Sequence, residues 1–450
     1  MKFIVAIMLP WVILIAQVPD TLWTKTYGGD SLDCGMAIQQ TGDGGFIIVG
    51  STRSFGAGES DVYLIRVNAD GSVVWARSYG GASSDSGLAV QQTSDGGYIV
   101  SGVTSSWGSG GKDIYLIKTD PNGDTVWTKT YGGRLDDEGR WVQQTSDGGY
   151  VIFGDKHLNS YRRDMYLLRT DSVGNLVWEQ TYYTRYLGDG SYVEETPDGG
   201  FYLVGSTEEY WTPYKRDLWI AVVDSLGNLV WKKRYGGSDY EWGNSGRILS
   251  DGGYIAVGMT RSYGGGHEDI YIVRTDSLGN LTWERFYGGS GEEQASSVVA
   301  TAGGDFVISA WTSSFGAGGF DLWVLKVDSL GDTLWARTYG GASDDLGLGI
   351  EILAENEYML VGQTASFGAG ESDVWLLRMG IKPEVSGGAD VGLKDYNIPT
   401  IFSGPLRLPS GRRCRVFDVS GRRIEPDQIR PGVYFIEIDG RVGWKVVKIR

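Results

Sequence analysis

Trp127-Thr-Lys-Thr-Tyr-Gly-Gly133 is the stretch that decides the fold, because the chain repeats it. Close copies begin at five other tryptophans, Trp23, Trp75, Trp231, Trp283 and Trp335. A degraded copy, Trp178-Glu-Gln-Thr-Tyr-Tyr, takes the remaining place, so the tryptophans recur every 51 to 53 residues. A fixed period of roughly this length is typical of a propeller or of an array of stacked repeats.

Each repeat contains four strand-like runs, which we name a to d in chain order. In the second repeat they are residues 88–93, 98–102, 113–118 and 125–131. The runs are rich in β-branched and aromatic residues and are bounded by turn formers, such as Asp95-Gly-Gly97 between a and b. No amphipathic helical period interrupts the array, so the sequence predicts an all-β protein.

The order of the runs predicts how the array ends. Runs a to c occur seven times, and the last set finishes at residues 373–378 without a run d after it. The first run d, around Trp23, precedes any a-to-c set. We therefore expect the N-terminal strand to complete the last sheet and close a seven-bladed β-propeller, which protects otherwise open edges. The tryptophans of run d are expected to wedge between blades.

The ends of the chain differ from the array. Residues 1–17 have a lysine followed by a short apolar run, which predicts a secretory signal peptide and not a membrane span. Residues 18–379 form the predicted propeller, 380–400 a linker, and 401–450 a small C-terminal β-sandwich. The mature chain is expected at the outer-membrane surface or outside the cell, without a membrane span.

Charge and cysteine content restrict the possible partners. The formal net charge is −16, although residues 401–450 carry 11 Lys and Arg against 5 Asp and Glu. An acidic array argues against nucleic acid as a partner, because phosphate recognition needs a basic face. The two cysteines are far apart, so no disulfide framework is expected, and Cys34 is interpreted as drift in an exposed loop.

Two resemblances support the propeller. Asp171-x-x-Gly174-x-x-x-Trp178 is similar to the tryptophan-docking motif of quinoprotein-type propellers. The order Gly96-Gly97, Tyr115, Trp127 resembles that of kelch repeats. Both resemblances imply a fold and neither implies an activity.

The tail resembles the C-terminal sorting domain of the bacterial type IX secretion system. The motifs are Arg415-Val-Phe-Asp-Val-Ser-Gly-Arg422, Pro431-Gly-Val-Tyr-Phe-Ile-Glu-Ile438 and Lys445-Val-Val-Lys-Ile-Arg450. The upstream strand of that family is matched only loosely, by Ile398-Pro-Thr-Ile-Phe402. The resemblance implies that residues 401–450 contact secretion machinery and that the protein is then released or attached at the surface. From composition alone, an ordinary basic β-domain that binds something acidic is the alternative.

Residues for catalysis or metal binding are scarce. His157 and His267 are the only histidines, and neither lies at metal-ligand spacing from another His or Cys. Glu194 and Glu195 are adjacent on one predicted strand, so they point to opposite faces and cannot act as a pair. We therefore predict no catalytic residue, no metal site and no cofactor.

Carboxylates cluster between runs d and a, at residues 136–138, 292–293 and 344–345. These loops and the b–c loops are expected on one face of the propeller. The clusters are interpreted as a solvated acidic rim, with weak calcium binding as the alternative.

The repeat breaks at blades 3 and 4, where aromatic residues and arginines replace glycine in the b–c loops and in the loop between the blades. Aromatic faces stack on sugars or proline-rich chains, and arginine pairs with carboxylates. We predict a ligand-binding patch there for carbohydrate or protein; drift in two variable loops is the alternative. Its residues are Tyr161, Arg162, Arg163, Tyr183, Arg185, Tyr186, Tyr210, Trp211 and Tyr214.

The function predicted from the sequence is that of an exported interaction module. Two alternatives stay open: a polysaccharide-acting hydrolase or lyase that uses an acid or a tyrosine on the loop-bearing face, and a purely structural surface-layer protein.

Overall fold

The computed structural model describes residues 18–159, 161–184, 186–208 and 215–381, and in the tail residues 401–402, 414–418, 423–425, 429, 432–438 and 441–448. The expected signal peptide lies outside the described residues, as does the linker apart from residues 380 and 381. The chain divides into two compact units, Met1–Lys382 and Pro383–Arg450. Nowhere in the described ranges is there a helix that is long and apolar enough to cross a membrane.

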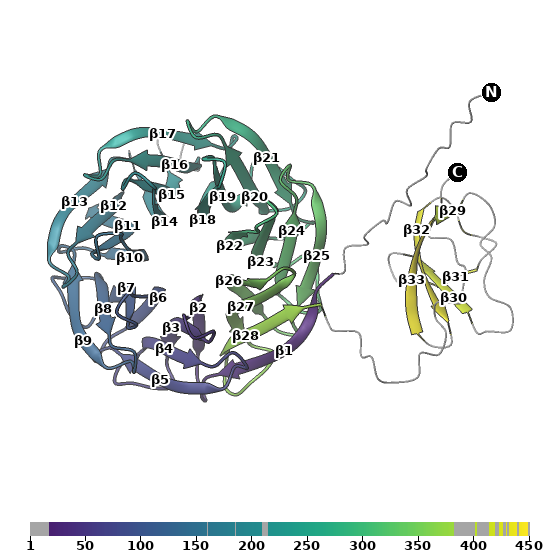
Figure 1. Cartoon of the computed structure of the whole chain (residues 1–450), viewed down its shortest axis with the longest axis horizontal. Helices are drawn as coiled ribbons and strands as arrows, with labels where there is room; N and C mark the ends of the chain where they lie inside the picture. Colours follow the sequence, from purple (N-terminus) through teal and green to yellow (C-terminus); the bar gives the residue numbers. More distant parts are fainter. Residues whose placement is uncertain are drawn as a thin grey trace, which may run out of the picture. The chain divides into compact units, whose positions relative to one another are not determined.

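Seven antiparallel sheets of four strands surround a central axis in the first unit, as Figure 1 shows, and confirm the predicted all-β propeller. Blade 1 contains β2 (Asp33–Gln40), β3 (Phe46–Thr52), β4 (Asp61–Val67) and β5 (Val73–Tyr79). Blade 2 contains β6 (Asp85–Gln92), β7 (Tyr98–Thr104), β8 (Asp113–Thr119) and β9 (Thr125–Tyr131). Blade 3 contains β10 (Asp137–Gln144), β11 (Tyr150–Asn159), β12 (Arg162–Thr170) and β13 (Leu176–Tyr182).

The remaining blades follow the same plan. Blade 4 contains β14 (Gly188–Glu195), β15 (Phe201–Thr207), β16 (Asp217–Val223) and β17 (Leu229–Tyr235). Blade 5 contains β18 (Glu241–Ile248), β19 (Tyr254–Thr260), β20 (Asp269–Thr275) and β21 (Leu281–Tyr287). Blade 6 contains β22 (Glu293–Ala300), β23 (Phe306–Thr312), β24 (Asp321–Val327) and β25 (Thr333–Tyr339). Blade 7 contains β26 (Asp345–Ala354), β27 (Glu357–Thr364), β28 (Asp373–Gly380) and β1 (Asp20–Tyr27).

The ring closes through the N-terminal strand, as the order of the runs predicts. β1 pairs antiparallel with β28 from Asp20 opposite Gly380 to Tyr27 opposite Val374 (Figure 1). The Trp375 indole N–H donates to Thr24 Oγ1 at 2.5 Å across this seam. Blade 7 therefore has four strands like the other blades, with its outermost strand supplied by the N-terminal segment.

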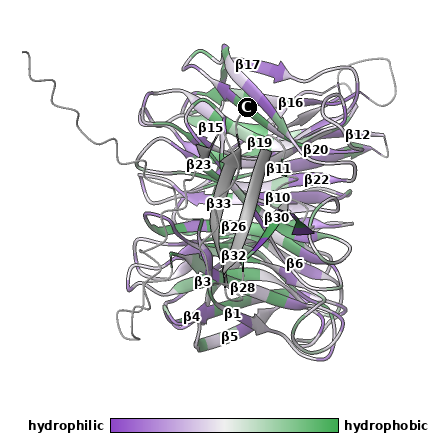
Figure 2. Cartoon of the chain, turned by 90° about the vertical axis from the view of Figure 1, so that its right-hand side faces the viewer, coloured by the Kyte–Doolittle hydropathy of each residue, from purple (hydrophilic) through white to green (hydrophobic). Residues whose placement is uncertain are grey.

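The core lies between neighbouring blades. Between blades 1 and 2, Val49 and Leu64 pack in one cluster with Val100 and Ile117, and all four side chains are fully buried. Burial of such a side chain contributes roughly 1.5–3 kcal/mol. In the side view of Figure 2, hydrophobic stretches lie on the strands and alternate with hydrophilic ones.

The repeated tryptophan and tyrosine of strand d join each blade to the next. The Trp75 ring lies edge-on to Tyr98 of blade 2 at 5.8 Å, and the Tyr79 hydroxyl donates to the Gly123 carbonyl at 2.5 Å. Gly123 has φ +82°, and a Cβ there would lie 2.8 Å from Trp75. The turn between strands c and d therefore requires glycine, and Trp75 occupies the expected wedge position.

The second unit contains one five-stranded sheet among its described residues. Its order is β29 (Ile401–Phe402), β33 (Arg441–Lys448), β32 (Gly432–Ile438), β30 (Cys414–Asp418) and β31 (Arg423–Ile424). β29 pairs parallel with β33, and the other neighbours are antiparallel.

Candidate functional site

The d–a and b–c loops share one face of the propeller, which we call the upper face. At the junction of blades 1 and 2, Asp61 begins β4 and Asp85 begins β6, and both are 1% exposed. Asp85 Oδ2 accepts from the Gly81 N–H at 2.8 Å, and Asp61 Oδ2 accepts from the Ala57 N–H at 2.9 Å. A Cβ at Gly80 would lie 1.8 Å from Asp61 Oδ1 and 2.8 Å from Asp85 Oδ2. The first glycine of the Tyr-Gly-Gly motif therefore makes room for two carboxylates.

The same pair of carboxylates occurs at five further junctions. A Cβ at the equivalent glycine would contact one carboxylate from each blade at Gly28, Gly132, Gly236, Gly288 and Gly340. The expected solvated acidic rim is therefore wrong for part of each cluster, because Asp137, Glu293 and Asp345 are at most 1% exposed. These side chains satisfy loop N–H groups that would otherwise be buried without an acceptor.

The junction of blades 3 and 4 departs from this plan. Gly188 stands where the other strands a begin with a carboxylate, and Thr184 fills the space beside it, 2.4 Å from where a Cβ at Gly188 would lie. Thr184 Oγ1 donates to the Arg163 carbonyl at 2.9 Å. With the second carboxylate gone, Tyr183 occupies the position that Gly80 holds in blade 1.

A buried ion network takes the place of the missing carboxylate. Asp155 and Asp189 are fully buried, and Arg163 forms ion pairs with both of them. Arg140 Nε donates to Asp155 Oδ1 at 2.8 Å, and Arg216 Nη1 lies 2.7 Å from Asp189 Oδ2. Burial raises the pKa of Asp155, although Arg140 acts in the opposite direction.

Two features of this network bear on its strength. The contacts of Asp189 with Arg163 and Arg216 are ion pairs without hydrogen-bond alignment. The Arg216 guanidinium also lies over the Trp242 ring of blade 5 at 4.3 Å. The network thus ties three blades together, and loss of one partner would leave a buried charge without compensation.

Five of the nine predicted ligand-binding residues are described, and they fall into two groups. Tyr161 and Tyr183 are 83% and 63% exposed. The Arg162 guanidinium lies over the Tyr183 ring at 4.3 Å and contacts Asp164 Oδ2 at 2.7 Å. Arg163, by contrast, belongs to the buried ion network, and its backbone N–H donates to the Tyr186 carbonyl at 2.9 Å.

The other four predicted residues, Arg185, Tyr210, Trp211 and Tyr214, lie outside the described residues. In blade 3 the predicted loop at 157–163 is largely a hairpin, because β11 and β12 extend and pair His157 with Arg163. The structure thus brings Arg162 and Tyr183 together beside the hairpin tip that carries Tyr161.

A second candidate site lies on the axis. The strands a line a central cavity of about 460 Å³. On blades 3 to 5 its wall carries Arg140, Trp141, Tyr192 and Arg247. Blades 6, 7 and 1 contribute Trp311 and Glu351 together with small residues such as Ser296 and Gly349. The cavity is therefore asymmetric: both arginines of its lining, and two of its aromatic rings, lie on one side.

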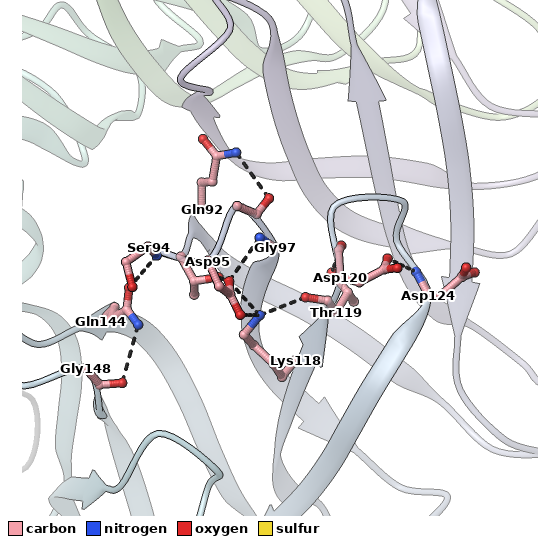
Figure 3. Close-up of polar contacts among 12 residues, drawn as sticks. Gln92, Ser94, Asp95, Gly97, Lys118, Thr119, Asp120, Asp124, Gln144 and Gly148 are labelled. Carbon is pink, nitrogen blue, oxygen red and sulfur yellow. Dashed lines mark hydrogen bonds and ion pairs between the residues drawn. The ribbon is translucent and has the colours of Figure 1, made fainter.

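The lower end of the cavity, opposite the upper face, has polar links between blades. The side-chain oxygens of Gln39, Gln91 and Gln143 each accept a backbone N–H from the following blade at 2.5–2.7 Å. Figure 3 shows a second link between blades 2 and 3, in which Gln144 accepts from the Ser94 N–H at 2.8 Å. Glu194 continues the series by accepting from the Ile248 N–H at 3.0 Å. Arg247 and Glu351 hold the equivalent positions in blades 5 and 7, and within the described residues their side chains accept no such backbone N–H.

Other reactive groups do not form a site in the described part of the chain. No group of three His, Cys, Asp or Glu side chains there could hold a metal ion. Cys34 lies in strand β2 and not in a loop, and burial, followed by Asp33, raises the pKa of its thiol to about 12. Burial and Arg163 lower the pKa of His157.

Sequence reasoning did not identify the cavity wall. The available signal was the comparison of strands a position by position: where other blades have Ala37, Ala89 or Gly349, blades 3 and 4 have Trp141 and Tyr192. At the next inward position, Gln39, Gln91 and Gln143 give way to Arg247 and Glu351.

Comparison with family models and with curated proteins covers little of the chain. No family model matches the chain. Regulatory protein FlaEY of Caulobacter vibrioides is 31% identical over 110 residues, which is 22% of this chain and 12% of that protein. The chain thus matches only a small part of that relative's length.

Solved structures resemble the chain at low identity. A protein of unknown function from Dyadobacter fermentans is 13% identical, with a TM-score of 0.47 over 81% of this chain and 99% of that one. The Neurospora crassa Pan2 WD40 domain is 12% identical, with a TM-score of 0.46 over 77% and 89%. The β-propeller domain of the trilobed protease from Pyrococcus furiosus is 11% identical, with a TM-score of 0.43 over 81% and 97%.

Proposed function

We propose that the chain is an exported binding module that recognises carbohydrate through the upper face of blades 3 and 4. The observation that carries the proposal is the stacked pair of Arg162 and Tyr183 beside the exposed Tyr161. Asp164 holds the Arg162 guanidinium over the ring, so little side-chain freedom remains to be lost on binding. A flat aromatic face next to fixed N–H donors suits a sugar ring and its hydroxyls.

A glycan array on the full-length protein tests this proposal, with Tyr183→Ala as the disrupting variant. Trp107→Ala is the matched control, because Trp107 is an exposed aromatic of a regular b–c loop, 46% exposed. We expect Tyr183→Ala to lose at least about tenfold in affinity, or about 1.4 kcal/mol, and Trp107→Ala to bind as the parent does. If Trp107→Ala loses glycan binding and Tyr183→Ala keeps it, the site is not on blades 3 and 4. If the protein binds no glycan and binds another protein instead, carbohydrate is the wrong ligand class.

We further propose export through an N-terminal signal peptide and a sorting tail at residues 401–450. The proposal is supported by the resemblance of the tail motifs, which fall on strands β30, β32 and β33. A chain that ends at residue 400 should accumulate in the periplasm when it is produced in a host with that secretion system. Surface delivery of the shortened chain would contradict the proposal.

A further inference from the structure

The central cavity has an arginine that the surrounding protein does not neutralise at close range. Arg247 is half-buried in the wall, and its guanidinium lies 5.1 Å from the centre of the Tyr192 ring. Its Nη1 donates to the Gly246 carbonyl at 2.6 Å. Within the described residues, no carboxylate lies within ion-pair distance of Arg247. A guanidinium has five N–H donors, and these contacts use only part of them.

Glu194, one of the two carboxylates that act on Arg247, is already engaged in other hydrogen bonds. Glu194 Oε2 accepts from the Tyr192 hydroxyl and from the Ile248 N–H, both at 3.0 Å. Burial alone would lower the pKa of Arg247, but its interactions with Tyr192, Glu194 and Glu351 outweigh that effect and raise it. Arg247 therefore remains a cation in the cavity.

Glu351 faces this cation from blade 7. It lines the same cavity, and its carboxyl group makes no hydrogen bond or ion pair with any residue that the structure describes. Burial raises the pKa of Glu351 to about 7, while Arg247 acts to lower it. The carboxyl group is thus partly protonated near neutral pH and can both donate and accept a hydrogen bond.

The wall behind Arg247 consists of aromatic rings packed against one another. Trp141 and Tyr192 have ring centres 4.7 Å apart, and Tyr202 stacks on Tyr254 of blade 5 at 4.7 Å. Tyr192 and Tyr202 are also in contact, with ring centres 6.4 Å apart, so the aromatic rings run through three blades. A packed support of this kind holds Arg247 in one position before a ligand arrives.

We propose that the central cavity binds a small carboxylate-bearing polyol, of the sugar-acid class, with its carboxylate on Arg247 and a hydroxyl on Glu351. An arginine fork pairs well with a planar carboxylate. A simple anion without hydroxyls would leave Glu351 without a donor and would be repelled by its charged form. Neutral polar groups from Asn244 and Gln294 line the same cavity and suit further hydroxyls. This site is separate from the patch at Tyr183.

Binding of three probes to the full-length protein, measured by calorimetry, tests the proposal: galacturonate, galactose and sulfate. We expect galacturonate to bind at least about tenfold more tightly than either of the others, since only it supplies both groups. Equal binding of galacturonate and galactose, or tighter binding of sulfate, would overturn the proposal. Trigalacturonate then distinguishes the source: tighter binding than the monomer indicates the end of an acidic chain, and equal or weaker binding a free sugar acid.

Variants locate the site. Arg247→Lys keeps the charge but removes the fork, and it should weaken galacturonate binding at least about tenfold. Glu351→Ala should weaken it severalfold. Ser296→Trp fills the cavity from the opposite wall and should abolish binding, whereas Ser225→Trp on an exposed turn should not.

A surface variant separates this site from the blade 3–4 patch. Tyr183→Ala should leave galacturonate binding unchanged, even where it abolishes binding on the glycan array. If Ser296→Trp and Arg247→Lys both bind galacturonate as the parent does, the cavity is not the site. That result would leave the surface proposal intact.

Discussion

Neighbouring blades are linked differently at two junctions, the one between blades 1 and 2 and the one between blades 3 and 4. In the first, Asp61 and Asp85 satisfy the loop N–H groups, and Gly80 leaves them room. In the second, one carboxylate is replaced by Gly188, and buried arginines take over the link between blades. Where only one carboxylate is present, the glycine that makes room for two is not required, and Tyr183 takes its position. Blade 3 therefore exposes an aromatic side chain where the regular blades have glycine.

The largest expected effect comes from breaking the substitute network. Asp189→Ala leaves Arg163 and Arg216 without their shared carboxylate, and we expect it to lower the free energy of unfolding by about 3–5 kcal/mol. Ser86→Ala is the matched control, because Ser86 holds the same position in blade 2 and is half-buried; it should change stability by less than about 0.5 kcal/mol. Urea unfolding followed by tryptophan fluorescence measures both, and equal effects would show that the network carries no special weight.

A smaller effect concerns pH and the regular pair between blades 2 and 3. Burial raises the pKa of Asp137 from 3.8 to about 6, while the Gly133 N–H acts to lower it. The folded protein therefore holds this proton more tightly than the unfolded chain, and the stability it contributes is full below about pH 4 and is lost as the pH rises through 6. The parent loses part of its free energy of unfolding between pH 4 and pH 7 for this reason. Asp137→Asn should make that loss smaller by about 2–3 kcal/mol.

Unfolding of the parent and of Asp137→Asn at pH 4 and pH 7 measures this contribution. The difference between the two proteins isolates one carboxyl from the others that titrate in the same range. A difference in stability that stays constant across this pH range would contradict the assignment.

The smallest effect tests the second glycine of the repeated motif. A Cβ at Gly81 would lie 2.6 Å from Ser106 Cβ, whereas at Gly133 the nearest atom, Asp137 Oδ2, is 3.8 Å away because blade 3 has replaced its b–c loop. Overpacking costs about 1–3 kcal/mol, and an exposed loop can yield, so we expect about 1 kcal/mol for Gly81→Ala. Gly133→Ala should stay within about 0.5 kcal/mol of the parent. Thermal unfolding of the two variants decides, and a larger loss at Gly133 would be inconsistent with this comparison.

Much of the fold was predictable because its signals are local and repeated. The spacing of Trp23 to Trp335 counts the blades, and the position of the first strand d before any strand a predicts that β1 pairs with β28. Strand identity follows from β-branched runs between turn formers, since each strand is short and its neighbour in the sheet is usually its neighbour in sequence. The exposed Tyr161 and Tyr183 were found by the same logic, as departures from a repeat.

The inner wall was not predictable in this way. Every strand a contains a register shift, such as that between Gly139 and Trp141, which places two residues opposite one. A bulge of this kind breaks the alternation by which sequence assigns side chains to faces. It therefore hid the fact that Arg140, Trp141 and Tyr192 line one cavity.

The sequence by itself determines the period, the turns and the closing strand, because each depends on residues close together in sequence or on a pattern that recurs. Ring closure decided the rest. It brings Arg247 of blade 5 and Glu351 of blade 7 to one cavity, and it buries Asp137, Glu293 and Asp345 in junctions where composition alone suggested a solvated rim. Those outcomes depend on which neighbour each side chain meets across a blade boundary, and that is set by packing in three dimensions.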